Sequence, residues 1–221
     1  MKELFLTFEG PDGSGKTTQL RRLAESLQAL GYDTVVTREP GGTPISDHIR
    51  SLVLTPDYKE MADHTEVLLY AASRAQHVRE FIVPALKANR IVLCDRFVDA
   101  SLAYQAYGLG ISFDEVAAIN RFATGGLEPT RTYLLDVPVE TSRRRLLART
   151  QSAGGEGLDR IEQKGEAYHT RVREGFMKIL EQNPKRICLI DADRTQDEIA
   201  HDILQDCKQL LDRVFFPKPE V

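Results

Sequence analysis

The chain has 221 residues, 42% hydrophobic and 28% charged, and 29 Lys and Arg against 33 Asp and Glu leave a net charge of −4. These values are close to those of globular proteins and exclude a mainly disordered chain. They also argue against a nucleic-acid partner and a membrane span, and the three scattered cysteines favour a reducing, cytoplasmic setting.

Short apolar segments alternate with amphipathic ones along the chain. In chain order they predict strand Leu4–Phe8, helix Lys16–Leu30, strand Thr34–Thr37, helix Asp63–Val83, strand Ile91–Cys94, helix Phe113–Phe122, strand Thr132–Val137, helix Pro138–Arg149, helix Glu162–Glu181, strand Arg186–Ile190 and helix Gln196–Val214. Near-continuous apolar strands are typical of a parallel sheet covered on both faces. We therefore predict one α/β domain over residues 1–214, a three-layer α/β/α fold with a five-stranded parallel sheet. Pro84 is expected to break its helix or to start a new one.

Two segments show neither periodicity. Thr150–Gly157 contains three glycines and is flanked by arginines, and we predict that about residues 149–161 form a mobile lid. A lid that closes over ATP would bring positive charge to the transferred phosphoryl group and exclude water. A disordered surface loop is the alternative. Residues 215–221 are expected to be a frayed tail.

The connection between the first strand and the first helix matches the pattern G-x-x-x-x-G-K-[ST]. Its residues are Gly10, Pro11, Asp12, Gly13, Ser14, Gly15, Lys16 and Thr17, followed by Thr18. Glycines allow backbone N–H groups to point at phosphate oxygens, and the helix N-terminus adds partial positive charge. Lys16 can reach the β- and γ-phosphates, and the Thr17 hydroxyl can bind Mg²⁺. The segment therefore predicts a nucleotide-binding P-loop, with a chance glycine-rich turn as the alternative.

A carboxylate and an arginine follow the third strand directly. Asp95 ends the run Ile91–Cys94, and Arg96 comes next. Ligands of open α/β sheets bind at the carboxyl ends of the strands, so Asp95 could hold Mg²⁺ and Arg96 could clamp a phosphate. An ordinary turn residue or helix cap is the alternative for Asp95.

Further polar residues are placed to reach the same crevice. Arg38 and Arg50 flank a loop after the second strand and could converge with Arg96 on one anion, although each could also be a solvated surface arginine. Glu66, Tyr70, Arg74 and His77 share one face of a predicted helix, where an aromatic ring and an arginine could bind a flat base. A solvated helix face is the alternative. Ser101, Tyr104 and Gln105 offer hydroxyl and amide groups to a base or a sugar.

Together these residues resemble the bacterial thymidylate kinases. The shared segments, in chain order, are Phe8–Thr18, Arg38–Thr43, Leu68–Arg74, Asp95–Phe97, Ala103–Gln105, Asp159–Ile161 and Asp191–Arg194. The resemblance implies a P-loop NTP hydrolase-like fold and phosphoryl transfer from MgATP to dTMP, giving dTDP and ADP for dTTP synthesis. It also implies a homodimer.

The resemblance assigns roles to single residues. The expected dTMP-binding set is Asp12, Arg38, Arg50, Tyr70, Arg74, Arg96, Ser101, Tyr104 and Gln105. In it, Arg38 and Arg96 would bind the phosphate, Tyr70 would stack on thymine, and Tyr104 would crowd the sugar 2′ position. The P-loop would bind ATP together with Arg145 and Arg194, and Thr17 and Asp95 would hold Mg²⁺. The expected catalytic residues are Lys16, Arg96 and, because Gly13 and Ser14 leave the P-loop without an arginine, Arg149 and Arg160 of the lid.

Two other functions remain open from the sequence. The first is a kinase for another nucleoside monophosphate, such as dUMP, UMP or a purine nucleotide. The second is a nucleotide-dependent switch or assembly ATPase, since a P-loop is common to ATPases, GTPases and kinases. An acceptor-dependent release of ADP separates the kinases from the switch.

Overall fold

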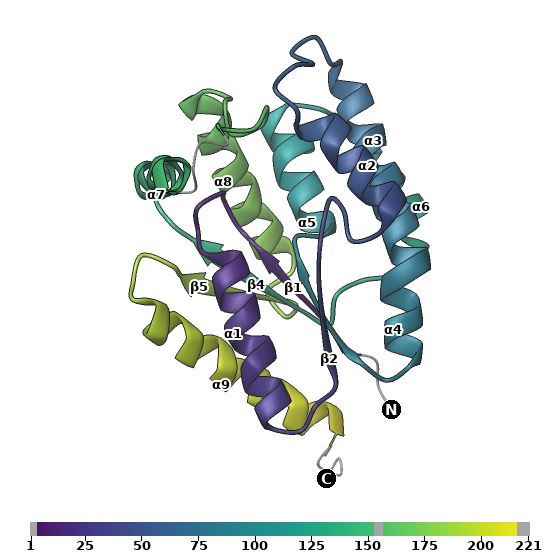
Figure 1. Cartoon of the computed structure of the whole chain (residues 1–221), viewed down its shortest axis with the longest axis vertical. Helices are drawn as coiled ribbons and strands as arrows, with labels where there is room; N and C mark the ends of the chain where they lie inside the picture. The colour runs from purple at the N-terminus through teal and green to yellow at the C-terminus, as the bar shows by residue number, and fades with distance from the viewer. Residues whose placement is uncertain (1–3, 153–156, 216–221) are drawn as a thin grey trace.

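Five parallel strands form one sheet at the centre of the molecule, with helices on both faces (Figure 1). The computed structural model describes residues 4–152 and 157–215. The strands are β1 (Phe5–Glu9), β2 (Thr34–Arg38), β3 (Ile91–Asp95), β4 (Arg131–Asp136) and β5 (Ile187–Asp191). Their order across the sheet is β2-β3-β1-β4-β5. Each strand lies within one residue of its predicted bounds, and the predicted α/β fold is confirmed.

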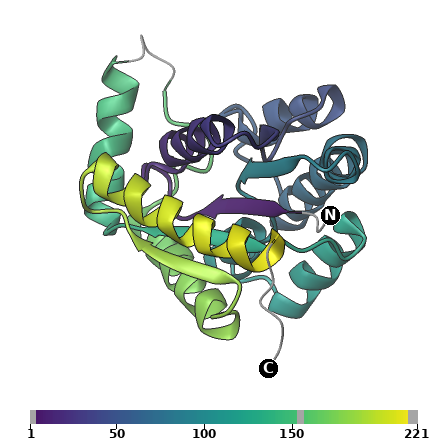
Figure 2. The ribbon, with the colours of Figure 1, turned by 90° about the horizontal axis from the view of Figure 1, so that it is seen from below.

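The helices surround this sheet. In chain order they are α1 (Lys16–Ala29), α2 (Pro44–Leu54), α3 (Asp63–His77), the π-helix η1 (Val78–Ile82), α4 (Val83–Lys87), α5 (Val98–Ser101), the π-helix η2 (Leu102–Gly108), α6 (Phe113–Thr124), α7 (Val139–Ser152), α8 (Glu166–Gln182) and α9 (Gln196–Phe215). Helices α1 and α9 lie side by side on one face in both views (Figures 1 and 2). Within the described residues, no helix combines the length and apolarity needed to cross a bilayer.

Strand β1 is buried on both faces, which explains its unbroken apolar sequence. Leu6 and Phe8 pack into the core beneath α1 and α9, whereas Phe5 points the other way and packs with residues of η1 and α4. Its neighbours β3 and β4 are parallel to it, so the carboxyl ends of three central strands meet at one edge. This edge is where an open α/β sheet binds its ligands.

One predicted helix is divided in the structure, and two helices were not predicted. The segment predicted as helix Asp63–Val83 is α3, a π-helical turn and then α4, which has Pro84 in its first turn, where a missing N–H costs nothing. Helices α5 and η2 were not predicted. Ala100, Leu102 and Ala103 are all buried there, so no polar face reveals the helical period.

The lid region also departs from the prediction. Helix α7 continues to Ser152, so the loop expected from Thr150 begins later. Residues 153–156 of the predicted lid and 216–221 of the predicted tail lie outside the described residues. The next helix begins at Glu166 rather than Glu162, because Asp159 accepts the backbone N–H groups of Ile161 and Glu162, both at 2.8 Å, and forms a turn.

Candidate active site

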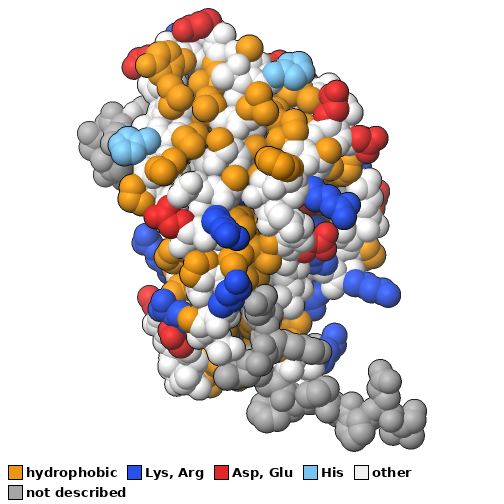
Figure 3. Space-filling model, turned by 90° about the vertical axis from the view of Figure 1, so that its right-hand side faces the viewer, with side chains coloured by type: hydrophobic (Ala, Val, Ile, Leu, Met, Phe, Trp, Pro, Cys, Tyr) orange, Lys and Arg blue, Asp and Glu red, His pale blue; other side chains and the backbone are white. Residues whose placement is uncertain are grey.

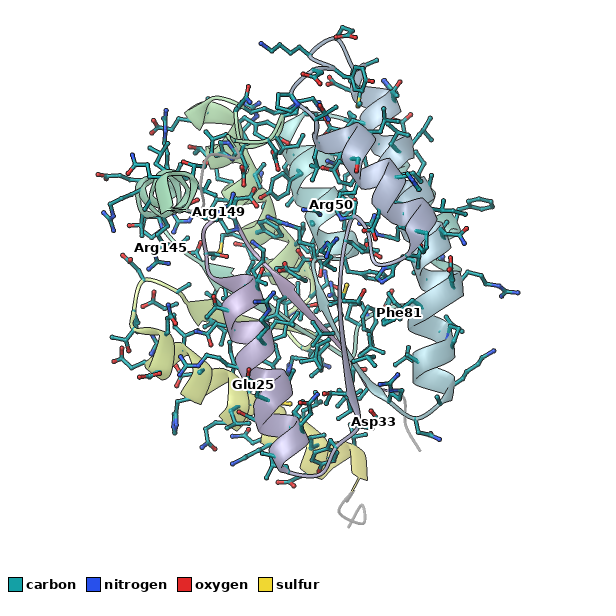
Figure 4. The ribbon with its side chains drawn as sticks, in the orientation of Figure 1. Glu25, Asp33, Arg50, Phe81, Arg145 and Arg149 are labelled. Carbon is teal, nitrogen blue, oxygen red and sulfur yellow. The ribbon has the colours of Figure 1, made fainter. Side chains whose placement is uncertain are left out.

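A cleft of about 1220 Å³ lies at the carboxyl edge of the sheet, between the P-loop, α2, α3, η2 and the end of α7. Most of the predicted site residues line it: Asp12, Gly13, Gly15, Lys16, Thr17, Thr18, Arg38, Arg50, Tyr70, Arg74, Asp95, Arg96, Ser101, Tyr104, Gln105, Arg145 and Arg149. Gly10, Pro11 and Ser14 belong to the same P-loop. In Figure 4, Arg145 and Arg149 extend from α7 and Arg50 from α2, on opposite sides of this region. Residues from distant parts of the chain therefore meet in one cleft.

The P-loop is seated tightly against its neighbours. A Cβ atom on Gly10 would lie 2.3 Å from the carbonyl oxygen of Leu135, and one on Gly13 would lie 2.6 Å from that of Ser142. Both glycines also have positive φ angles, 133° and 77°. Larger residues would clash at both positions, so the sequence requirement for glycine is steric as well as conformational. The result is a rigid cradle of backbone amides at the start of α1.

Lys16 is buried inside this loop. Its Nζ donates hydrogen bonds to the carbonyl oxygens of Gly10 at 3.2 Å and Pro11 at 2.8 Å. Burial and then the neighbouring Arg96 guanidinium lower the pKa of Lys16 to about 8, against the opposing effect of Asp12. A bound phosphate would favour the charged ammonium group. The lysine is therefore held in place beside the position where phosphate would bind.

Thr17 and Asp95 supply two neighbouring oxygen atoms in the part of the cleft beside the P-loop. The Thr17 hydroxyl donates a hydrogen bond to the Asp95 carboxylate. The pairing follows from the parallel register of β1 and β3, in which Phe8 lies opposite Asp95, so the end of β3 reaches the P-loop. A hydroxyl and a carboxylate are hard oxygen ligands of the kind that Mg²⁺ prefers.

Arg96 connects the P-loop to the other end of the cleft. Its guanidinium donates to the carbonyl oxygen of Gly10 at 3.0 Å, to the Tyr104 hydroxyl at 3.0 Å and to the Asp12 carboxylate. Burial by itself would raise the pKa of the Asp12 carboxyl, but Arg96 and then Lys16 outweigh burial and hold it well below its usual range. Arg96 also has a left-handed backbone, with φ 71°. Such a conformation is uncommon for a residue other than glycine and is frequent at functional sites.

Two more arginines lie close to Arg96, as the sequence predicts. Arg50 donates to the carbonyl oxygen of Pro40 at 2.9 Å, and Arg38 donates to Asp47 at 3.2 Å. Burial lowers the pKa of Arg50, and the positive charges of Arg38 and Arg96 lower it further. Mutual repulsion of this kind would be relieved by an anion bound between the three guanidinium groups.

The polar face of α3 is buried, so the alternative of a solvated helix face is wrong. Glu66, Arg74 and His77 are 0%, 2% and 0% exposed, and Tyr70 is half-buried at the cleft. Glu39 contacts both Arg74 and His77, and Arg160 pairs with Glu66, which explains how these polar side chains can be buried. Tyr70 and Arg74 of this face line the cleft, and Glu66 and His77 are buried behind them.

Arg74 is held by a set of partners that the sequence did not reveal. Its Nε donates to Glu39 at 2.6 Å, its Nη1 to Ser101 at 2.8 Å and to Asn120, and its Nη2 to the Phe97 carbonyl oxygen at 2.9 Å. Glu39 is itself buried. Its position directly after Arg38 at the end of β2 is a signal that could have indicated it. These bonds fix the guanidinium plane at the cleft wall.

The lid arginines separate into two groups. Arg149 donates to Glu162 at 2.6 Å, and Arg145 donates to the Ala192 carbonyl oxygen at 3.0 Å; both line the cleft. Arg160 instead faces α2 and α3, where it donates to Glu66 at 2.8 Å and to the Val53 carbonyl oxygen at 3.0 Å.

Arg194 is also placed outside the cleft wall. It lies between β5 and α9, where it donates to Asp202 at 2.6 Å and to the carbonyl oxygen of Asp191 at 3.2 Å. Neither Arg160 nor Arg194 is thus among the described residues that line the cleft.

Glu9 is a buried carboxylate behind the cleft that the sequence interpretation did not single out. Its Oε1 accepts the backbone N–H of Phe97 at 2.7 Å, directly after Arg96, while its Oε2 has no partner within the described residues. Burial and then the nearby Asp99 carboxylate raise the pKa of Glu9 to about 8, against the opposing effect of Arg96. Its place at the end of β1, next to Gly10, is the signal that could have identified it.

Glu9 should make the protein less stable as pH rises. The raised folded-state pKa means that the folded chain binds more protons than the unfolded chain between about pH 4.5 and 8, so the free energy of unfolding falls across this window. Replacing Glu9 with glutamine should therefore raise Tm at pH 9 by a few degrees and leave Tm at pH 5 nearly unchanged. For a chain of this size, 1 kcal/mol in the free energy of unfolding corresponds to about 2–4 °C in Tm. Thermal unfolding at both pH values measures this difference.

Glu25 provides the matched control for this prediction. It is exposed on α1 and labelled in Figure 4, so Glu25→Gln should change Tm equally little at both pH values. An equal gain for Glu9→Gln at pH 5 and pH 9 would mean that ionisation of Glu9 does not oppose folding.

Known proteins are similar to this chain in sequence and in fold. The family model described as Thymidylate kinase matches residues 8–203. A thymidylate kinase from Exiguobacterium sibiricum is 54% identical over 213 residues, covering 95% of this chain and 98% of the relative. One from Geotalea uraniireducens is 47% identical over 194 residues, covering 88% and 91%. The crystal structure of thymidylate kinase from Ehrlichia chaffeensis superposes with a TM-score of 0.74 at 30% identity, covering 92% of this chain and 98% of that one. The resemblance inferred from the motifs is thereby confirmed, and the chain belongs to the thymidylate kinase family.

Proposed function

We propose that this chain transfers the γ-phosphoryl group of ATP to dTMP, giving dTDP and ADP. The observation that carries this proposal is the single continuous cleft, with Lys16 of the P-loop at one end, Tyr70 and Arg74 at the other, and Arg96 between them. Two nucleotides placed end to end would meet with their phosphates at Arg96. Membership of the thymidylate kinase family supports the same reaction.

Catalysis would depend on positioning and on charge stabilisation. Lys16 would exchange its bonds to the Gly10 and Pro11 carbonyl oxygens for bonds to the ATP phosphates. Arg96 would hold the dTMP phosphate in line with the ATP γ-phosphate, with Arg38 and Arg50 beside it. Arg149, at the end of α7, remains the predicted arginine that would stabilise the transferring group, and Arg145 remains a predicted ATP contact.

Thr17 and Asp95 fit a magnesium ion bound together with ATP. Their oxygen atoms are adjacent, and Mg²⁺ is commonly held by one or two protein oxygens plus phosphates and water. Among residues 4–152 and 157–215, no three His, Cys, Asp or Glu side chains gather at one metal position, so the site would need the nucleotide to be complete. When bound, the ion would neutralise charge on the β- and γ-phosphate oxygens.

The other end of the cleft suits a deoxyribonucleoside. The Tyr104 hydroxyl donates to Asp12 at 2.8 Å, which holds the ring where the sugar would lie and would leave little room for a 2′-hydroxyl. Tyr70 would stack on the base. Ser101 and Gln105 line the same wall. We expect these groups to favour dTMP over UMP.

An acceptor screen tests the proposed function. ADP release by the purified protein with MgATP is measured with dTMP, dUMP, UMP, dCMP and GMP as separate acceptors. We expect release to depend on an acceptor and to be fastest with dTMP. Release at the same rate without an acceptor would overturn the proposal in favour of a nucleotide-dependent switch, and preference for a purine nucleotide would indicate another kinase.

We also propose that the protein is a cytoplasmic enzyme. Its three cysteines, Cys94, Cys188 and Cys207, are free thiols, two of them buried. Disulfides are rare in reducing compartments and common in secreted proteins, so unpaired thiols favour a reducing compartment.

The proposal also keeps the prediction that about residues 149–161 form a lid that closes over ATP.

A homodimer is proposed from the surface formed by α2, α3 and α6. Exposed apolar side chains there include Ile45 and Leu52 of α2, Leu68 of α3 and Phe122 of α6, which is 91% exposed. Figure 3 shows apolar side chains gathered over much of this side of the molecule. A self-complementary apolar face suits the two-fold pairing of identical chains.

Replacing Phe122 with aspartate should weaken this pairing. A two-fold interface would bury two new carboxylates, one from each chain, in an apolar contact, so the cost in free energy would be incurred twice. Sedimentation velocity should show a dimer for the natural chain and a shift toward monomer for the variant. Leu189→Asp, on the exposed edge strand β5, is the control and should stay dimeric. A natural chain that sediments as a monomer at micromolar concentration would contradict the proposal.

A further inference from the structure

Glu66 lies between Gln105, which lines the cleft, and Arg160, near the end of the predicted lid. It is fully buried on α3, one helical turn before Tyr70. Its Oε1 accepts a hydrogen bond from Nε2 of Gln105 at 3.0 Å, and its Oε2 accepts one from Arg160 at 2.8 Å. Lys164 adds a weaker contact to Oε2 at 3.9 Å. The carboxylate thus binds two different elements at once.

The bond to Gln105 fixes the orientation of its carboxamide group. An ionised carboxylate only accepts hydrogen bonds, so Gln105 must direct its NH₂ group toward Glu66 and its carbonyl oxygen the other way. Gln105 is 2% exposed and lines the cleft together with Tyr70 and Arg74. Across residues 4–152 and 157–215, no hydrogen bond reaches Oε1 of Gln105. Glu66 therefore leaves a fixed hydrogen-bond acceptor at the base end of the cleft.

An acceptor in this place distinguishes between pyrimidines. Thymine and uracil carry a hydrogen on N3 and can donate it, whereas cytosine has a bare N3 that can only accept. A cytosine facing the Gln105 carbonyl oxygen would place two acceptors together and leave both without a donor. Sites that require a hydrogen bond reject ligands that cannot form it, because the buried polar group stays unpaired.

We propose that Glu66 is a positioning residue that selects thymine over cytosine by fixing the Gln105 carboxamide. The inference rests on the proposed function, since it concerns which base enters that site. Glu66 itself does not line the cleft, and it acts through Gln105.

Any change at Glu66 also affects its second bond, to Arg160, so an experiment must separate the two effects. Arg160 also donates through Nε to the Val53 carbonyl oxygen and through its backbone N–H to that of Leu54, both at 3.0 Å. The Glu66–Arg160 pair therefore fastens residues 157–164 to α2 and α3. Loss of this attachment would affect turnover with every acceptor, whereas loss of the Gln105 orientation would affect one base more than another.

Glu66→Gln is the direct test. Glutamine has nearly the same shape but can donate as well as accept, so both orientations of Gln105 become possible. The readout is the ratio of kcat/KM for dTMP to kcat/KM for dCMP, measured by ADP release. We expect this ratio to fall about tenfold or more, chiefly through a higher KM for dTMP, with the KM for ATP nearly unchanged.

Arg160→Met is the matched control, because it removes the attachment but keeps the Glu66 carboxylate opposite Gln105. We expect the ratio to stay within about twofold of the natural chain, even where kcat falls for both acceptors. If Glu66→Gln does not fold, the double variant Glu66→Met, Arg160→Met replaces the buried ion pair with apolar side chains, an exchange that proteins often tolerate. It should lose selectivity as Glu66→Gln does.

Three outcomes would overturn the inference. These are an unchanged ratio in Glu66→Gln, an unchanged ratio in the double variant, or an equal fall in Arg160→Met, which would trace selectivity to the attachment. Failure of the proposed function would look different, because the natural chain would then show no dTMP-dependent ADP release at all.

Discussion

Replacing Lys16 with methionine should lower kcat for ADP release by about 10²–10³-fold, the usual cost of losing one preorganised donor to transition-state charge. Lys16 is buried in the P-loop, and its Nζ already lies within hydrogen-bond distance of Gly10 and Pro11, which surround the phosphate position. Methionine keeps the length and apolar volume of the side chain, so the loop should retain its shape. Steady-state kinetics at saturating ATP and dTMP measure the effect.

A second methionine variant, Lys87→Met, tests whether losing a lysine charge outside the cleft also lowers kcat. Lys87 is exposed on α4, away from the cleft, so Lys87→Met should leave kcat within about twofold. If Lys16→Met kept normal turnover while its Tm stayed unchanged, Lys16 would have no part in stabilising the transferred group, and the assignment of the P-loop as the phosphate site would be wrong.

Arg96→Met should raise KM for dTMP by about 100-fold while changing KM for ATP much less. Truncating one partner of a buried charge pair commonly costs about 2–5 kcal/mol. Two interactions are lost here. Asp12 loses the guanidinium that holds its pKa low, and the dTMP phosphate loses a planar group that donates two hydrogen bonds. The pKa of Asp12 should then rise. As the pH is lowered, the variant should therefore lose activity at a higher pH than the natural chain does.

Two further variants sharpen this prediction. Arg96→Lys keeps the charge without the planar fork and should lie between the natural chain and Arg96→Met in its KM for dTMP. Arg90→Met, at the opposite end of β3, breaks an exposed pair with Asp33 and should leave both KM values unchanged. Asp33 is labelled in Figure 4 well below the cleft. An equal rise in the KM values of ATP and dTMP for Arg96→Met would argue against a specific acceptor role.

The catalytic assignment of Arg160 shows where motif-based interpretation reaches its limit. The sequence places this arginine in a motif near the end of the predicted lid, which indicates that it is important without indicating what it contacts. In the structure, its partner Glu66 is 94 residues away along the chain. A long, flexible side chain can turn toward a phosphate or toward a buried carboxylate, and only the packing of α2 and α3 against residues 157–164 determines which. The catalytic role of Arg160 therefore stays an untested prediction.

Buried carboxylates were harder to predict than phosphate-binding residues. Glu9, Glu39 and Glu66 are each almost completely enclosed, and their positions at strand ends or on a polar helix face do not indicate which partners would bury them. Their burial is possible because arginines, a histidine and backbone N–H groups from other elements meet them. Those partners come together only when the helices pack on the sheet.

The local sequence pattern was enough to predict the strands and the P-loop, because both depend on interactions between residues close in the chain. The family was predicted from the motifs that follow these strands. An unbroken apolar run requires cover on both faces, and a glycine-rich turn before a helix requires only neighbours in the chain. The tertiary structure alone decided which charges face the cleft and which are paired behind it, since that choice depends on desolvation and on partners contributed by distant segments. The same reason explains η2, whose helical period is hidden because every side of it is covered.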